Sequence, residues 1–226
     1  GDRSGAGRRK AIMVTKVGRR GARDGGSRRV YPLHADISEM LFTPEEIQRR
    51  VKELAAEIVR EHQGEPLILI SILKGSVVFL VDLMRHIPTS CSIDFIGISS
   101  YEGAKSSGVV RVTTDLRESI EGRAVVVVED IIDTGLTMVY LRDNLLTRKP
   151  KSLKICALLD KPANREIAIR PDYLGFTIPN RFVVGYGLDY REQYRNLAYI
   201  GVLRESVYTP PPGGRHEPPI WLPHPS

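Results

Sequence analysis

Hydrophobic residues in the middle of the chain follow helical spacing in some stretches and extended spacing in others. After Thr43, apolar residues recur every three or four positions and fall on one helical stripe. Thr43 and Glu46 have the spacing of a capping box, and Pro44 suits the first helical position. We therefore expect a helix over 44–62. Similar patterns predict helices near 76–86 and 137–146, and strands near 67–73, 93–99, 109–114, 124–128, 153–159, 173–178 and 182–186.

One of these strands has the composition of a fully buried one. The run from Ala124 to Val128 is apolar and mostly β-branched, with no polar alternation. This is typical of a strand covered on both faces in a parallel sheet. Strands that alternate with helices indicate an α/β fold with helices on both faces of the sheet. In such folds ligands bind beyond the carboxyl ends of the strands, so we expect the chemistry there.

The two ends of the chain differ in composition from its middle. Residues 1–29 hold ten Lys or Arg, two Asp and seven Gly, which predicts a disordered basic arm. Residues 209–226 hold seven of the fifteen prolines and predict an extended, disordered tail. The chain has a formal charge of +6, but the arm alone carries +8 and the tail cancels, so the expected domain, 30–208, is at −2. The basic character therefore gives little reason to expect nucleic acid as a partner.

Cysteine content and hydropathy indicate the cellular setting. Cys91 and Cys156 are too few and too far apart for a disulfide framework or a Cys-rich zinc site. No apolar run approaches the roughly 20 residues that a membrane-spanning helix needs. No apolar segment of a secretory signal follows the basic arm. We expect a protein of the reducing cytoplasm that has no membrane partner.

The segment VVVVEDIIDTGLT, residues 125–137, concentrates polar groups where a strand passes into a helix. Its second half offers a glycine, two threonine hydroxyls and the free N–H groups of a helix start, which together favour a phosphate. Glu129, Asp130 and Asp133 would repel that phosphate, unless ligand hydroxyls or a cation such as Mg²⁺ lie between them. A ribose phosphate bound with a metal ion meets both conditions. The structural alternative, a capping Asp133 and an acid pair that ends a strand, does not explain why all these groups gather at one junction.

This segment resembles the motif with which type I phosphoribosyltransferases bind phosphoribosyl diphosphate (PRPP). The motif is a hydrophobic strand, two adjacent acids, two small or apolar residues, Asp-Thr-Gly and a further Thr. The segments ILKGS, LLDKP and RFVVGYGLDYREQYR narrow the resemblance to the hypoxanthine-guanine phosphoribosyltransferases of the bacterial type, from Leu41 to Tyr208. It implies the type I phosphoribosyltransferase fold, with a central, mostly parallel sheet flanked by helices and a small hood. The implied reaction is Mg²⁺-dependent transfer of 5-phosphoribosyl from PRPP to a 6-oxopurine, a step of purine salvage that yields IMP or GMP and pyrophosphate.

The resemblance also implies the residues that hold PRPP. Glu129 and Asp130 would hold the ribose hydroxyls, and Asp133 would also act as the general base near the purine N7. The 5-phosphate would be wrapped by Asp133, Thr134, Gly135, Leu136 and Thr137, although some family members have lysine at the position of Leu136. The diphosphate would lie against Lys74, Gly75 and Arg195, with a cis peptide between Leu73 and Lys74. Ser100 and Tyr101 would lie at the start of a mobile lid, and residues 101–114 would close over the site.

The purine site is implied in the same way. Lys161 would donate to the 6-oxo group, Phe182 would stack on the base, and Val183 would contact it through its backbone. Asp189 would lie beside the base and hold a second metal ion. The implied metal ligands are thus Glu129, Asp130 and Asp189. The resemblance leaves open the preference among hypoxanthine, guanine and xanthine, and whether the chain forms a homodimer or a homotetramer.

Three other classes of protein remain as alternatives. A PRPP- or nucleotide-sensing regulator of nucleic acid with this fold would fit the basic arm, but it would not need a complete base pocket and metal site. An aspartic protease shares the triplet Asp-Thr-Gly, but it needs a second catalytic Asp and a mostly β chain. A structural or nucleotide-storage protein would not need Lys74 or Asp189. P-loop and G-x-G-x-x-G motifs are absent from the sequence, which excludes the ATPase and dinucleotide readings.

Overall fold

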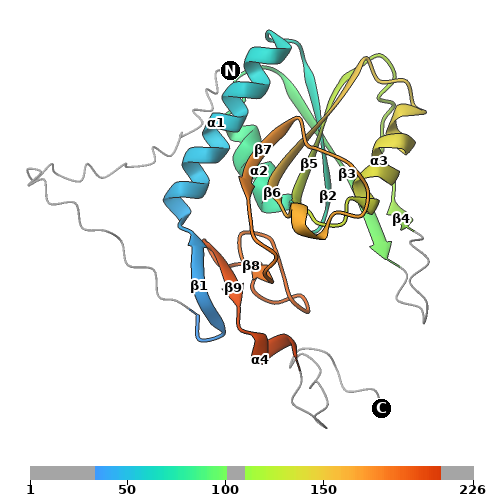
Figure 1. Cartoon of the computed structure of the whole chain (residues 1–226). Helices are drawn as coiled ribbons and strands as arrows, with labels where there is room; N and C mark the ends of the chain where they lie inside the picture. The colour runs from blue at the N-terminus through green and yellow to red at the C-terminus, as the bar shows by residue number, and fades with distance from the viewer. Residues whose placement is uncertain (1–33, 101–109, 210–226) are drawn as a thin grey trace, which may run out of the picture. The chain divides into compact units, whose positions relative to one another are not determined.

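The structure, a computed structural model, describes residues 34–100 and 110–209. Within these residues a six-stranded sheet forms the centre of the domain (Figure 1). Its β2–β3, β2–β5, β5–β6 and β6–β7 pairs are parallel, whereas β3 and β4 pair antiparallel, so the predicted mostly parallel sheet is confirmed. In order across the sheet, the strands are β4 (Val110–Thr114), β3 (Cys91–Ser100), β2 (Leu67–Leu73), β5 (Ala124–Ile132), β6 (Ser152–Asp160) and β7 (Tyr173–Thr177).

Helices cover both faces of this sheet, as the sequence predicts. On one face α1 (Pro44–His62) and α2 (Val77–Arg85) pack against one set of strand side chains, which includes Val126 and Val128. On the other face α3 (Leu136–Leu146) packs against a second set, which includes Val125 and Val127. The alternation follows from the two-residue period of a strand. Each fully buried valine side chain contributes about 1.5–3 kcal/mol of transfer free energy.

The start of α1 confirms the predicted capping box. The Thr43 hydroxyl accepts from the Glu46 N–H at 3.2 Å, and the Glu46 carboxylate accepts from the Thr43 N–H at 2.8 Å. Two N–H groups that the helix cannot satisfy thereby gain partners. The backbone hydrogen bond from Thr43 also lowers the pKa of Glu46. The boundary of α1 could therefore be predicted from side-chain chemistry alone.

A smaller, three-stranded sheet lies beside the main one and forms the hood (Figure 1). Its order is β1 (Ile37–Phe42), β9 (Ile200–Leu203) and β8 (Val183–Val184), all antiparallel, and the short α4 (Glu205–Tyr208) follows β9. The sequence patterns did not predict β1, β9, α4 or the short 3₁₀ helix η1 (Pro162–Asn164). Strand β1 is set by pairing with residues some 160 positions away, such as Ile37 with Leu203, which local periodicity does not reveal.

Two predicted strand ends need correction. Strand β5 runs to Ile132 rather than ending at Val128, because its pairing with β6 continues to Ile132–Asp160, so the acid pair lies within the strand. Strand β8 ends at Val184 instead of residue 186, since Gly185 has a φ of 99° and its N–H donates to the Leu188 carbonyl. The expected basic arm, nearly all of the expected tail and residues 101–109 of the expected lid lie outside the described residues.

Candidate active site

The acid pair lies at the carboxyl end of β5, where Glu129 is buried and Asp130 is partly buried. Glu129 is buried, and its Oε2 has no hydrogen-bond partner among the described residues. Burial, with a smaller contribution from the adjacent Asp130, holds the pKa of Glu129 well above its usual value. Burial also raises the pKa of Asp130, to about 6. Two adjacent carboxyl groups, one buried and one partly buried, are costly to ionise together, so this place favours a cation.

The donor set fits a hard cation that keeps other ligands. Magnesium prefers carboxylate oxygen and is usually held by one or two carboxylates together with water and substrate phosphates. In residues 34–100 and 110–209, no group of three or more His, Cys, Asp or Glu side chains could hold a metal by itself. Asp189 lines the same cavity as the acid pair, but its carboxylate is 2.9 Å from the Arg195 guanidinium. The structure therefore brings the three expected ligands to one cavity without joining them in one cluster.

The turn after β5 combines a small cavity with the uncapped start of a helix. Helix α3 begins after Gly135, which has a φ of 88° and no side chain that could cap the first turn. The Leu136 N–H points back to the Thr134 hydroxyl, 3.4 Å away. A cavity of about 110 Å³ lies at this turn and is lined by Glu129, Ile131, Ile132, Asp133, Thr134, Gly135, Thr137 and Met138. Uncapped N–H groups at a helix start attract an anion.

Glycine lets three chain segments meet beside the acid pair. A Cβ on Gly75 would overlap the Asp130 carboxylate, and a Cβ on Gly187 would overlap the Gly75 carbonyl. Strands β2 and β5 pair up to Ser71 and Val128, so the turn after β2 comes next to the end of β5. The peptide bond between Leu73 and Lys74 is cis, as the resemblance implies.

A cavity of about 580 Å³ lies beside Gly75 and Asp130. Its lining includes Lys74 and Arg195, the two cationic residues expected to bind the diphosphate. The cavity is lined by Ile72, Leu73, Lys74, Gly75, Ile98, Glu129, Asp130, Asp189, Glu192 and Arg195. The Lys74 ammonium lies 3.1 Å from the Glu192 carboxylate, and Arg195 donates to the Gly187 carbonyl at 2.8 Å. Sequence reasoning missed Glu192, although an acid between Asp189 and Arg195 in the same motif was a usable signal.

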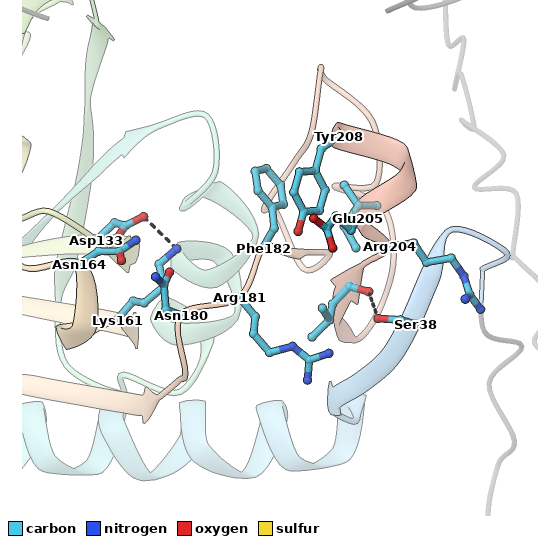
Figure 2. A pocket seen from close by; sticks show the side chains of 12 residues that line it. Ser38, Asp133, Lys161, Asn164, Asn180, Arg181, Phe182, Arg204, Glu205 and Tyr208 are labelled. Carbon is cyan, nitrogen blue, oxygen red and sulfur yellow. Dashed lines mark hydrogen bonds and ion pairs between the residues drawn. The ribbon is translucent and has the colours of Figure 1, made fainter. Parts of the chain in front are cut away.

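Asp133 and Lys161 are neighbours because their strands are in register. Asp133 follows the end of β5 and Lys161 the end of β6, and the last residues of these parallel strands, Ile132 and Asp160, pair. The Lys161 ammonium, whose side chain is 10% exposed, lies 2.9 Å from Asp133 Oδ2 (Figure 2). The other carboxylate oxygen, Oδ1, has no hydrogen-bond partner in the described chain. An acceptor and a cation thus lie side by side at the carboxyl ends of β5 and β6.

The expected purine residues share one cavity with this pair. A cavity of about 230 Å³ is lined by Asp130, Ile131, Asp133, Lys161, Phe182, Val183, Leu188 and Asp189. A larger one of about 710 Å³ shares Asp133, Lys161 and Phe182 and extends under α4 (Figure 2). The Phe182 ring is 37% exposed and stacks on Tyr208, with the ring centroids 5.0 Å apart and 22° between the planes. Tyr208 was not predicted, because its place depends on how the hood folds.

Two expected residues are not placed. Ser100 ends β3, where it pairs with Val110, and nothing is described of its side chain. Tyr101 lies outside the described residues. Their expected place in the lid stays a prediction.

Most of the chain matches known proteins. The family model of the phosphoribosyl transferase domain matches residues 38–191. The hypoxanthine-guanine phosphoribosyltransferase of Bacillus subtilis is 51% identical over 174 residues, which cover 76% of this chain and 97% of that protein. The chain belongs to the hypoxanthine-guanine phosphoribosyltransferase family. The bifunctional protein TilS/HprT of Listeria innocua is 48% identical over 178 residues, 78% of this chain, and the chain spans only 28% of its length.

Solved structures agree with this family. A hypoxanthine phosphoribosyltransferase from Staphylococcus aureus superposes with a TM-score of 0.74 at 49% identity, over 77% of this chain and 95% of the other. The Trypanosoma cruzi enzyme in complex with the product IMP gives 0.75 at 46% identity, over 79% of this chain and all of the other. The expected type I phosphoribosyltransferase fold is confirmed. A parallel α/β sheet does not fit an aspartic protease, and the names of these relatives give the regulator no support.

None of the helices in the described residues is long and apolar enough to cross a membrane.

Proposed function

We propose that the chain transfers the 5-phosphoribosyl group from PRPP to hypoxanthine or guanine and releases pyrophosphate. The observation that carries this is the register of β5 and β6. It joins an acceptor, Asp133, and a buried cation, Lys161, beside the phosphate turn. Membership of the family supports the reaction, and the cavities described above give each part of the two substrates a place.

PRPP would lie along the end of β5. Its 5-phosphate accepts from the N–H and hydroxyl groups of Thr134–Thr137, and its ribose hydroxyls donate to Glu129 and Asp130. Its diphosphate enters the 580 Å³ cavity, where Lys74 and Arg195 supply positive charge. The crowding at Gly75 supports this placement, since the bare backbone there leaves the Asp130 carboxylate room.

The acid pair fits Mg²⁺ as the divalent ion, because Glu129 is buried beside Asp130 and its Oε2 has no protein partner in the described chain. Bound there with PRPP, the ion would offset the charge that builds up on the leaving diphosphate. Asp189 lies across the same cavity and would be the ligand for a second ion.

The base would enter between Phe182 and the Asp133–Lys161 pair. Lys161 donates to the 6-oxo oxygen, and the backbone of Val183 contacts the ring edge. Asp133 accepts the proton from N7, which makes N9 the nucleophile. The bond from C1 of the ribose to the diphosphate oxygen breaks, the bond from C1 to N9 forms, and pyrophosphate leaves with the electron pair. General-base assistance of this kind accounts for about 10²–10⁴-fold in rate.

The substrates, PRPP and a 6-oxopurine, are thus small molecules. We also propose that the chain forms a homodimer or homotetramer in the cytoplasm and has no membrane or nucleic-acid partner.

The test is pyrophosphate release by the full chain with PRPP and Mg²⁺ against hypoxanthine, guanine, xanthine, adenine and uracil. We expect release with hypoxanthine and guanine, and at least tenfold lower kcat/KM with adenine and uracil. The 6-amino group of adenine would set a donor against the Lys161 ammonium, and uracil lacks the ring that carries N7 and N9. No release with any base, or equal release with adenine, would contradict the proposal. Comparing the rates for xanthine, guanine and hypoxanthine shows which substituent at position 2 of the purine the site prefers.

A further inference from the structure

Glu192 connects the two cations of the diphosphate cavity. Its Oε2 lies 3.1 Å from the Lys74 ammonium and 3.4 Å from the Arg195 guanidinium. Lys74 follows β2, whereas Glu192 and Arg195 belong to the segment between β8 and β9. A single carboxylate oxygen therefore bridges charges from two distant parts of the chain.

A tight loop sets the position of this carboxylate. Glu192 has a φ of 63°, and its neighbours Arg191 and Tyr194 have φ values of 53° and 73°. Residues other than glycine rarely adopt this left-handed region, so three in one short loop are unusual. The Glu192 N–H donates to the Asp189 carboxylate at 2.8 Å, which ties the loop to the cavity wall. The loop presents Glu192 towards Lys74 by its backbone conformation.

The charges around the cavity make this carboxylate consequential. Among the described residues, Lys74 and Arg195 are the basic ones that line it, against the carboxyl groups of Glu129, Asp130, Asp189 and Glu192. A diphosphate that enters must bring its negative charge to those two cations. The diphosphate therefore competes with Glu192 for both cations. Of the two cations, Asp189 contacts Arg195.

We propose that Glu192 holds the place of a diphosphate oxygen when the site is empty and competes with pyrophosphate for Lys74 and Arg195. This rests on the proposed function, which places the diphosphate in this cavity. The consequence is kinetic and thermodynamic: Glu192 weakens the binding of pyrophosphate and speeds its departure as product.

The exposure of the partners fits an exchange of this kind. The Lys74 side chain is 65% exposed and that of Glu192 is 41% exposed. Ion pairs this open to water contribute little to stability, so an incoming ligand can displace one at small cost. Lys74 lowers the pKa of Glu192 through a hydrogen bond, which keeps the carboxylate charged at neutral pH. A buried, rigid pair could not be exchanged in this way.

The test is the variant Glu192→Gln, in which the amide keeps the shape of the side chain and removes its charge. Binding of pyrophosphate with Mg²⁺ is measured by calorimetry on the full chain, and product inhibition is measured in the transfer reaction. We expect pyrophosphate to bind about three- to tenfold more tightly than to the unmodified chain, because the competing charge is gone. The gain should shrink at high salt, since exposed charges are screened.

A matched control and a second variant separate the possible results. Glu121→Gln removes another exposed Glu, which lies 4.0 Å from the Lys149 ammonium and does not line this cavity, and should leave pyrophosphate affinity unchanged. Lys74→Ala should weaken pyrophosphate binding. If Lys74→Ala weakens it but Glu192→Gln leaves it unchanged or weaker, the inference is wrong and the proposed function stands. If Lys74→Ala has no effect, the diphosphate does not lie in this cavity, and both the placement and the inference fail.

Discussion

The Lys161 ammonium lies 2.9 Å from Asp133 Oδ2, and the pair forms because β5 and β6 end opposite one another. Lys161 is nearly buried, so the carboxylate supplies the counter-charge that such a cation needs. The same two groups match two features of a 6-oxopurine, a ring N–H that donates and a carbonyl that accepts, of which adenine has only the first. Sheet register thus brings together, from residues 28 positions apart, the two groups that we propose recognise the purine.

Replacing Asp133 with Asn should remove the base and keep the shape. An amide can still accept from Lys161, but it cannot take a proton from the purine. We expect kcat to fall by about 10²–10⁴-fold, while the Kd for PRPP measured by calorimetry stays within about threefold. Asp143→Asn, at an exposed position on α3, is the control and should behave as the unmodified chain. Unchanged turnover in Asp133→Asn would show that another group takes the proton.

Replacing Lys161 with Ala should lower the selectivity for 6-oxo over 6-amino purines. The variant loses a charged donor to the 6-oxo oxygen, which corresponds to about 10- to 100-fold in kcat/KM for hypoxanthine. Adenine makes no such contact, so its low rate should change much less. Lys151→Ala, which removes an exposed partner of Glu65, is the control. Equal losses for both bases would mean that Lys161 only supports the structure of the site.

Replacing Gly75 with Ala should damage the PRPP site by crowding. The new Cβ would overlap the Asp130 carboxylate, so either the turn after β2 or the acid pair must move. We expect the KM for PRPP to rise by about tenfold or more, because misplacing such groups by about 1 Å is costly. Gly122→Ala is the control: an alanine would be strained at this φ of 70°, but the surroundings are open. It should lower the melting temperature without changing the KM for PRPP.

Replacing Tyr208 with Ala should release the ring of Phe182. The two rings stack at 5.0 Å, and the edge contact with Tyr190 leaves Phe182 37% exposed beside the base cavity. Aromatic pairs of this kind are worth about 0.5–1.5 kcal/mol, so we expect the KM for hypoxanthine to rise about two- to tenfold. The KM for PRPP should stay the same, and Tyr208→Phe should restore the KM for hypoxanthine. A rise in both KM values would point to a general loss of the hood.

The sequence was most informative where one segment carries its own chemistry. The valine run predicted a buried parallel strand, and the capping box placed the start of α1. The turn after β5 could be predicted because Asp133, Thr134 and Gly135 are contiguous and line one cavity. The roles of Lys161 and Phe182 came from the resemblance, since nothing local distinguishes them from a loop lysine and a core aromatic residue.

What could not be predicted depends on distant pairing. Strand β1 forms because β9 lies beside it, and Tyr208 reaches Phe182 because both belong to the hood. The bridge made by Glu192 depends on left-handed backbone conformations at residues other than glycine, which residue type alone does not predict. These features arise from tertiary packing, and sequence periodicity carries no information about them.

The central claim is that the end of β5 and the turn into α3 hold the sugar and the 5-phosphate of PRPP. A crystal structure of the full chain with PRPP and Mg²⁺ tests it most directly. The account predicts the 5-phosphate within hydrogen-bond distance of the N–H groups at Thr134–Thr137 and the ribose hydroxyls at Glu129 and Asp130. PRPP bound elsewhere, with this turn free of phosphate, would contradict it.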